Sequence, residues 1–339
     1  MRRFIIIIFV FCIFNSSFAD KAQLAEFLSG MDEKYTEKDF QRTEIPEVNY
    51  RGYIPVGWDY DIEPLAGVPS AMIFNKKSKR DEFLSIVNIK IYNKIKSEKI
   101  FNHYVDAIVS NIPDWKEKIN MYTPEYNMII GGYTEDSKEV YNIFASMEIA
   151  REMFLFIGAC DKDRLKNGFY ELFAKSFKDV YPINIYTLDG KISLKYKDGY
   201  IREKSREEET TLLSLAVINQ SEKFTLEGNT LVDSVVVGGS IMPLGYNLKG
   251  LVDGNVDEIR KAFNGFKMIE EGERSIDGSK SNYILFKYKL QDMEIFSMQD
   301  YVIHNQSYYV IGYTQVINDV KKLKEKMSKL LSEIKFSKD

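Results

Sequence analysis

The chain has 339 residues, of which 45% are hydrophobic and 14% aromatic, enough for about two domains with cores of their own. This composition excludes a protein that is disordered throughout. The formal net charge of −4 excludes a surface that is basic overall, so nucleic-acid binding is not the expected role.

The first 19 residues are typical of a signal peptide. Arg2 and Arg3 precede an apolar run at 4–14, and Ser17 and Ala19 place small residues at the minus-three and minus-one positions of a cleavage site. The run is shorter than the roughly 20 residues that span a bilayer. We therefore expect cleavage after residue 19 and a periplasmic or extracellular protein without a transmembrane segment; an uncleaved anchor is the weaker alternative.

Removal of the signal peptide changes the charge and the cysteine count. The mature chain keeps 44 basic and 50 acidic residues, a net charge of −6. Only Cys160 of the two cysteines remains, so no intramolecular disulfide can form. The protein must then be held together by its hydrophobic core.

Residues 20–52 are interpreted as a short amphipathic helix at 21–30 followed by a polar lead-in. A turn at Tyr53-Ile54-Pro55-Val56-Gly57-Trp58 then opens the first half. Alternating apolar residues predict strands at 71–74 and 83–92, and an apolar stripe predicts a helix at 97–112 capped by Ser97. Four further strands are expected as an antiparallel meander, at 118–122, 127–133, 140–149 and 153–158, before a closing helix at 163–177.

The second half shows the same order of patterns from about residue 182. Strands are predicted at 211–218 and 232–237, with a solvated charge run at 202–209 between the opening turn and the first of them. A helix is expected at 255–266. Strands at 283–288, 293–303 and 308–313 and a closing helix at 319–334 complete the half.

A short motif supports a duplication. Phe154-Leu155-Phe156-Ile157-Gly158 recurs as Tyr308-Tyr309-Val310-Ile311-Gly312, and each copy leads into an amphipathic helix that we expect to end at Phe177 or Phe336. Four apolar positions of the two helices match in register, Leu165 with Leu323, Phe169 with Met327, Leu172 with Leu330, and Phe173 with Leu331. The sequence therefore predicts tandem modules at 53–181 and 182–339.

The order of elements resembles the PsbP-like superfamily, which includes the extrinsic PsbP protein of photosystem II and DcrB-like proteins of bacterial envelopes. The resemblance rests on the opening 53–58, the aromatic strands before Gly158 and Gly312, and the terminal Phe177 and Phe336. It implies an α+β fold of two tandem α/β/α sandwiches, each a mainly antiparallel sheet flanked by helices. It also implies binding or assembly roles, with no shared set of catalytic residues.

Few residues suit catalysis or metal binding. His103 lies off the apolar stripe of its helix, and His304 lies in a predicted turn, so both are expected to be exposed. Asp253, Asn255 and Asp257 have the spacing of a calcium loop, but the glycine and the glutamate of that motif are missing, and capping of a helix by Asn255 explains them better. We expect no catalytic, cofactor or metal site.

Cys160 is the one potential nucleophile, and its neighbours Asp161 and Asp163 oppose ionisation of the thiol. A buried, inert thiol is the expected state, with a redox or modification site and a thiol enzyme as alternatives. Exposed aromatic residues are the remaining clue: Trp58, Trp115, Tyr308, Tyr309 and Tyr313 are a possible binding patch, although aromatic residues more often form core.

These observations favour an exported, non-enzymatic module that binds another protein of the cell envelope and needs no cofactor. The alternative is a carrier of a small molecule or lipid in a cleft between sheet and helix. An enzyme using Cys160 is the third hypothesis.

Overall fold

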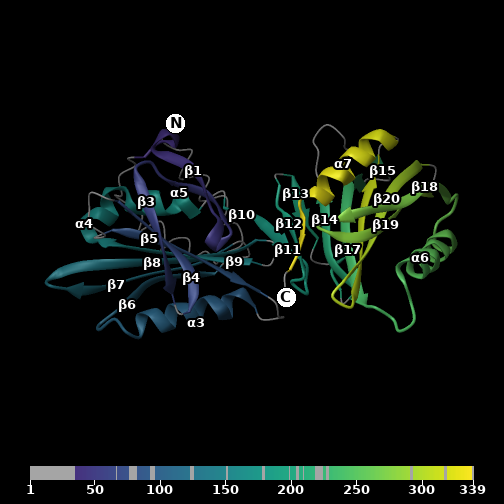
Figure 1. Cartoon of the computed structure of the whole chain (residues 1–339). Coiled ribbons are helices and arrows are strands. Elements are labelled where there is room, and N and C mark those ends of the chain that lie inside the picture. The colour runs from purple at the N-terminus through teal and green to yellow at the C-terminus, as the bar shows by residue number, and fades with distance from the viewer. Residues whose placement is uncertain are drawn as a thin grey trace. The chain divides into compact units, whose positions relative to one another are not determined.

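A computed structural model describes most of the chain from residue 35 onward. The described residues are 35–65, 67–75, 82–91, 96–122, 126–149, 152–177, 180–197, 199–203, 206–208, 210–217, 224–226, 229–290, 293–316 and 319–337. The predicted signal peptide and the predicted helix at 21–30 lie outside them. Two compact units divide between Ile183 and Asn184, and each is built on one large sheet (Figure 1). The sequence placed the division after residue 181.

The first unit contains a seven-stranded antiparallel sheet in the order β3-β4-β5-β9-β8-β7-β6. The central strands β5, β7 and β9 are buried on both faces because both faces of the sheet are covered, whereas the edge strand β3 is more exposed. Their bounds are β3 (Trp58–Leu65), β4 (Val68–Asn75), β5 (Phe83–Lys90), β6 (Lys116–Tyr122), β7 (Tyr126–Glu135), β8 (Lys138–Ile149) and β9 (Glu152–Asp161).

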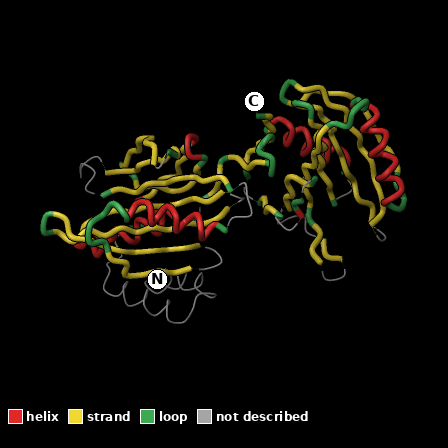
Figure 2. The backbone as a smooth tube through the Cα atoms, turned by 90° about the horizontal axis from the view of Figure 1, so that it is seen from below, coloured by secondary structure: helices red, strands yellow, loops and turns green. Residues whose placement is uncertain are grey.

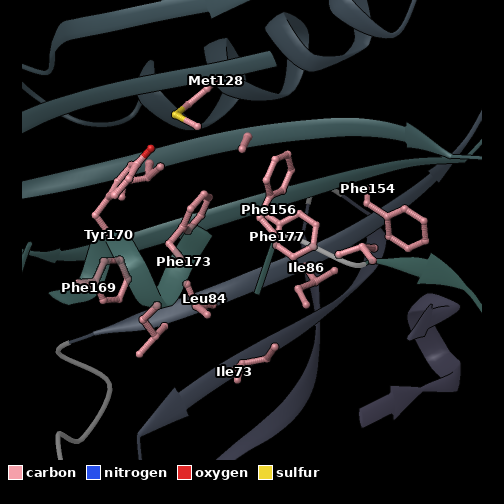
Figure 3. Packing of buried hydrophobic residues seen from close by; sticks show 14 of the residues in the cluster. Ile73, Leu84, Ile86, Met128, Phe154, Phe156, Phe169, Tyr170, Phe173 and Phe177 are labelled. Atoms are coloured by element: carbon pink, nitrogen blue, oxygen red, sulfur yellow. The ribbon is translucent and has the colours of Figure 1, made fainter. Parts of the chain in front are cut away.

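One helix covers each face of this sheet. Helix α3 (Ser97–Val109) buries Phe101 and Val105 against one face, where Leu155 and Ile157 also lie. Helix α5 (Tyr170–Phe177) covers the other face with an aromatic core (Figure 3). The rings of Phe156 and Phe177 meet edge to face there, 5.2 Å apart.

Two predicted helix details were wrong. The N-cap residue of α3 is Lys96, which makes no side-chain capping bond, rather than Ser97. The closing helix is interrupted: α4 (Lys162–Arg164) and a π-helical segment (Leu165–Phe169) precede α5. The break lies at Asn167 and Gly168, and Gly168 has a φ of 97°, a left-handed conformation that glycine adopts without steric cost.

The predicted lead-in is not irregular chain but part of the module. Strands β1 (Phe40–Ile45) and β2 (Tyr50–Pro55) pair with each other, joined through the 3-10 turn η2 (Pro46–Val48), and a further 3-10 turn, η1 (Glu37–Asp39), precedes them. Strand β10 (Tyr181–Pro182), which follows α5, completes a three-stranded sheet. Tyr50 of β2 is fully buried, and its ring meets Phe154 and Phe156 edge to face. This sheet therefore belongs to the core of the first unit.

The second unit repeats the architecture. Its seven-stranded sheet has the order β13-β14-β17-β21-β20-β19-β18, again antiparallel. The bounds are β13 (Tyr200–Arg202), β14 (Thr211–Val217), β17 (Asp233–Ile241), β18 (Lys267–Ile276), β19 (Ser279–Leu290), β20 (Met293–His304) and β21 (Ser307–Gln315). A separate hairpin pairs β15 (Phe224–Leu226) with β16 (Asn229–Leu231).

Helices and a small sheet complete the second unit. Helix α6 (Leu248–Ala262) packs on β19 and β20, and helix α7 (Val320–Ser332) packs on β20 and β21. Strand β22 (Ile334–Phe336) follows α7 and joins β11 (Asn184–Tyr186) and β12 (Ile192–Lys195). The predicted α+β class with mainly antiparallel sheets is confirmed, and strands outweigh the few helices in both units (Figure 2).

The two units match strand by strand. Each strand of one large sheet has a counterpart at the same position of the other, and β1-β2-β10 corresponds to β11-β12-β22. The connection after β2 and the connection after β12 both contain a glycine with positive φ, Gly57 at 80° and Gly199 at 89°. Phe177 and Phe336 do not correspond, because Phe177 ends a helix whereas Phe336 lies in a strand.

The motif alignment is displaced by one residue. The hairpins β8–β9 and β20–β21 close on the pairs Ile149–Glu152 and His304–Ser307, so counting from these pairs sets Ile157 against Gly312. Gly158 contacts the α5 side of its sheet, whereas Gly312 lies on the face opposite α7. A shift of one residue reverses the face of every side chain in a strand, so matching the two glycines was misleading.

The predicted charge run at 202–209 is partly buried. Arg202 Nε donates to Glu207 Oε1 over 2.8 Å, and 4% of the Arg202 side chain and none of the Glu207 side chain is exposed. The backbone N–H of Ser214 donates to the same carboxylate. Glu207 of this buried ion pair is thus hydrogen-bonded to β14. Within the described residues, no helix is both long and apolar enough to cross a membrane.

Candidate interaction surface

The last residue of β17 and the connection to α6 display three large apolar side chains. Ile241 is 78% exposed, Leu244 is fully exposed and Tyr246 is 58% exposed, the highest values for large hydrophobic residues in the described part of the chain. Single exposed apolar residues are common, but three within the segment 241–246 mark a candidate interaction site.

The connection is an ordered turn. The backbone N–H of Tyr246 donates to the carbonyl oxygen of Pro243 over 3.2 Å, and Gly245 has a φ of 81°. A glycine with positive φ at the third position is typical of a type II turn. Leu244 therefore occupies the second position of the turn, at its apex.

Both ends of the turn are fixed. The backbone N–H of Met242 donates to the carbonyl oxygen of Gln306, in the β20–β21 turn, over 2.8 Å. On the other side Asn247 caps α6, because its Oδ1 accepts from the backbone N–H of Gly250 over 2.9 Å. The three apolar side chains are thus presented on backbone that is already ordered, which reduces the entropy cost of binding.

The adjoining face of the sheet is partly open, and it has a charged neighbour, Glu203, beside Ser214, the cross-strand partner of Val236. Ser240 pairs with Tyr308, and Val236, 36% exposed, pairs with Gly312. A Cβ atom built on Gly312 would find its nearest neighbours at 3.7 Å, so nothing packs tightly above it. We define the loop surface as Ile241, Leu244 and Tyr246.

A polar chain borders this face beneath α6. Asn255 Nδ2 donates to the hydroxyl of Tyr301 over 2.6 Å, and that hydroxyl donates to Gln299 Oε1 over 2.7 Å. Burial raises the pKa of Tyr301 well above its ordinary value, so its hydroxyl stays protonated. Asn255 lies within α6, whose N-cap is Asn247. The prediction that Asn255 caps this helix was wrong.

The equivalent face of the first unit is closed. Counting from the hairpin pairs, Leu155 and Ile157 correspond to Val310 and Gly312. Leu155 and Ile157 are buried beneath α3, as is Val87, the neighbour of Leu155. The open face therefore results from smaller side chains and from a helix that covers other strands.

The aromatic residues suggested by the sequence do not form one patch. Trp115 packs on Phe144 on the α3 side of its sheet, whereas Trp58 packs with the core on the α5 side. Tyr309 and Tyr313 are buried and their hydroxyls donate to Asp189 and Asp233. Core packing explains these four aromatic residues, and only Tyr308 adjoins the loop surface.

The sequence contained a signal for the loop surface. Apolar side chains rarely surround a turn, yet Ile241, Leu244 and Tyr246 flank Pro243 and Gly245. The sequence predicted no element between the strand at 232–237 and the helix at 255–266, so these exposed residues were not identified.

The potential reactive groups serve the structure. Cys160 is 1% exposed, and burial and the Asp161 carboxylate raise the pKa of its thiol far above the ordinary value. His103 is exposed as predicted. His304 is not simply exposed, since its ring stacks on Phe336 at 4.6 Å between centroids. The described residues contain no cluster of His, Cys, Asp or Glu that could hold a metal, and Asp253 and Asp257 lie within α6.

No protein-family model and no curated protein matches the chain. Among solved structures it is similar to cyanobacterial PsbP from Synechocystis, with 11% identity, a TM-score of 0.35, and 45% of this chain and 91% of that chain covered. LpqN of Mycobacterium tuberculosis, involved in cell envelope biogenesis, has 10% identity, a TM-score of 0.35, and coverage of 43% and 83%.

A third similar structure spans both units. The T6SS immunity protein TplEi of Pseudomonas aeruginosa has 11% identity and a TM-score of 0.30, and the match covers 88% of this chain and 97% of that chain. PsbP, the family that the sequence resembles, is thus among the proteins to which the chain is similar. At these identities the likeness concerns the fold alone.

Proposed function

We propose that the protein is an exported, non-enzymatic module of the cell envelope that binds another protein through the loop surface. The observation that carries the proposal is the fully exposed Leu244 at the apex of an ordered turn. Ile241 and Tyr246 beside it extend the apolar area.

The chemistry of the loop surface suits a protein partner. The three residues of the loop surface carry no charge, and Tyr246 offers a hydroxyl beside apolar area. Such residues are typical of the centre of a protein interface, where a few side chains provide most of the affinity. The backbone bonds of Met242 and Tyr246 hold them ready.

The packing supports this proposal over a carrier. In the first unit, the α3 and α5 faces of the sheet are lined by buried side chains such as Leu155 and Phe173. In the second unit, Val256 and Ile259 of α6 pack with Phe286. Side chains thus occupy the positions where a carrier would hold its ligand. A thiol enzyme is also disfavoured, because Cys160 is buried and its protonated form is favoured.

Partner recovery tests the proposal. The full chain carrying Ile241→Ser and Leu244→Ser is compared with wild type after cross-linking in the native envelope, purification and quantitative mass spectrometry. Loss of interface anchors costs about 2 kcal/mol or more each, so we expect recovery of the specific partner to fall at least ~30-fold.

A matched control separates the loop surface from general apolar exposure. Val56 and Ile62 of the first unit are also exposed apolar residues, at 54% and 40%. Val56→Ser with Ile62→Ser should leave recovery unchanged. Equal loss in both double variants, or no loss in the first, would refute binding through the loop surface. A co-purified small molecule seen by native mass spectrometry would instead favour the carrier.

A further inference from the structure

The opposite end of the second sheet carries a different kind of surface. Strand β17 ends at the loop surface, whereas β18 begins, β19 ends and α6 ends at the other end of the sheet. Phe263, Ile269 and Leu290 are exposed there, at 39%, 39% and 42%. We call these residues, with Lys267 and Lys289, the basic tip.

The apolar part of the basic tip is built by the connection after α6. The ring of Phe263 lies 4.3 Å from the ring of Tyr288, on the same face of β19 as Leu290. The backbone N–H of Lys289 donates to the carbonyl oxygen of Asn264 over 2.8 Å, which ties this connection to the strand. Ile269 lies in the register shift between β18 and β19.

The charged part consists of lysines at the same strand ends, where Lys287 and Lys289 alternate with Tyr288 and Leu290 along β19 and so project from the other face of the sheet. Lys267 lies directly opposite Lys287 in the β18–β19 pair, although like charges at such positions repel. Lys287 is neutralised by Glu294, 2.5 Å away. Lys267 and Lys289 are exposed and form no salt bridge with a described residue, so their positive charge remains.

Among the described residues, neighbouring acids cancel only part of this charge. Glu294 lies directly across from Lys289 in the β19–β20 pair and is one carboxylate beside Lys267, Lys287 and Lys289, so three positive charges face one negative charge. Asp257 pairs with Arg260 at 2.9 Å and Glu258 pairs with Lys261 at 2.8 Å, within α6. The pKa of Glu294 is lowered by its hydrogen bond to Lys287 and further by the charges of Lys289 and Lys267. The three lysines thus concentrate positive charge around Glu294, although the net charge of the chain is negative.

We propose that the basic tip docks on an anionic lipid surface. Exposed Phe and Leu side chains enter the boundary between headgroups and acyl chains, and the lysines at the same strand ends attract the anionic headgroups. Apolar area and positive charge together distinguish this end from the uncharged loop surface. The protein would then contact the membrane at one end of its second sheet and leave the other end free.

The test is co-sedimentation of the full chain with vesicles. Wild type should bind vesicles of phosphatidylcholine mixed with phosphatidylglycerol and should bind phosphatidylcholine alone much more weakly. Lys267→Ala and Lys289→Ala should each weaken binding about fivefold. Phe263→Ser with Leu290→Ser should weaken it about tenfold, and molar salt should abolish the preference for anionic vesicles.

Controls make the result decisive. Ile241→Ser with Leu244→Ser should leave vesicle binding unchanged, so failure of this proposal is distinguishable from failure of the proposed function. The lysine variants change only exposed side chains and decide the matter if the Phe263 variant proves unstable. Equal binding to neutral vesicles, no change in the lysine variants, or loss in the loop variant would overturn the inference.

Discussion

The helix-covered faces of the two large sheets differ although the strand order is the same. In the first unit α3 lies over Leu155 and Ile157, which are buried, whereas in the second unit Val310 and Gly312 occupy the corresponding positions of a partly open face. Topology therefore determines where a helix can lie but not how much of the sheet it covers. The open face has a smaller residue, Gly312, at the position of Ile157, and its helix α6 packs on β19 and β20.

The largest expected effect on stability comes from an ion pair that is buried in the second unit, compared with a surface pair in the first. Arg202→Met would leave the Glu207 carboxylate buried without its partner in the second unit, which costs about 3–5 kcal/mol. Lys118→Met in the first unit removes a surface pair with Glu139 and should cost about 1 kcal/mol or less. Hydrogen exchange followed by mass spectrometry reports each unit separately. Similar losses of protection in both variants would show that the buried pair has no special role.

The glycines sharpen the comparison of the two faces. A Cβ atom at Gly158 would lie 2.8 Å from Phe173 and 3.0 Å from Phe169, so Gly158→Ala should destabilise the first unit by about 1–3 kcal/mol. Gly312→Ala meets nothing closer than 3.7 Å and should change stability by less than about 1 kcal/mol. Both tryptophans, Trp58 and Trp115, lie in the first unit, so their fluorescence in urea follows the first variant. Hydrogen exchange in β21 reports on Gly312→Ala. A large loss of protection there would contradict an open face.

Acid titration tests the surface network of the first unit. Hydrogen bonds from Lys118, Lys162 and Tyr141 lower the pKa of Glu139 to about 2. The charged carboxylate therefore contributes stability that is present above the ordinary value of 4.5 and is lost as the pH falls through about 2, an effect reduced by solvent exposure. Carboxyl NMR should show this low value. It should rise in Lys118→Met and Lys162→Met, and an unchanged value would exclude the hydrogen bonds as its cause.

The smallest expected effect is that of the loop variant on the labelling rate of Cys160, which lies in the core of the first unit. Because the thiol is buried and protonated, labelling at neutral pH should be slow in the folded protein and fast in denaturant. Ile241→Ser with Leu244→Ser, in the other unit, should not alter that rate. Fast labelling of the native protein would restore the thiol enzyme as a hypothesis.

Much of the fold followed from the sequence because apolar periodicity reflects burial on sheets and helices. The meander from 118 to 158 and helix α3 were predicted close to their observed bounds. Strand β18 was missed, because an edge strand with charges such as Glu271 and Glu273 lacks an apolar pattern. Strands β1 and β2 were missed because their polar residues concealed a buried set that includes Tyr50.

The site was less predictable than the fold. Whether Tyr309 is core or surface depends on which face of the sheet α7 covers. The motif alignment was shifted by one residue, so it assigned the side chains of this strand to the wrong faces. Phe336 was expected to end a helix, as Phe177 does. It lies instead in the short strand that follows α7. The loop surface was detectable only as apolar residues beside a turn. Its exposure depends on how far α6 extends over the sheet, which local sequence does not encode.

Photo-cross-linking from residue 244 in the native envelope tests protein binding by the loop surface most directly. A photoreactive residue at Leu244 should give one specific protein adduct, which disappears when Ile241 and Tyr246 are replaced by serine. The same residue at Ile62, exposed in the first unit, should not give that adduct. Absence of an adduct from position 244, or the same adduct from both positions, would contradict the proposed function.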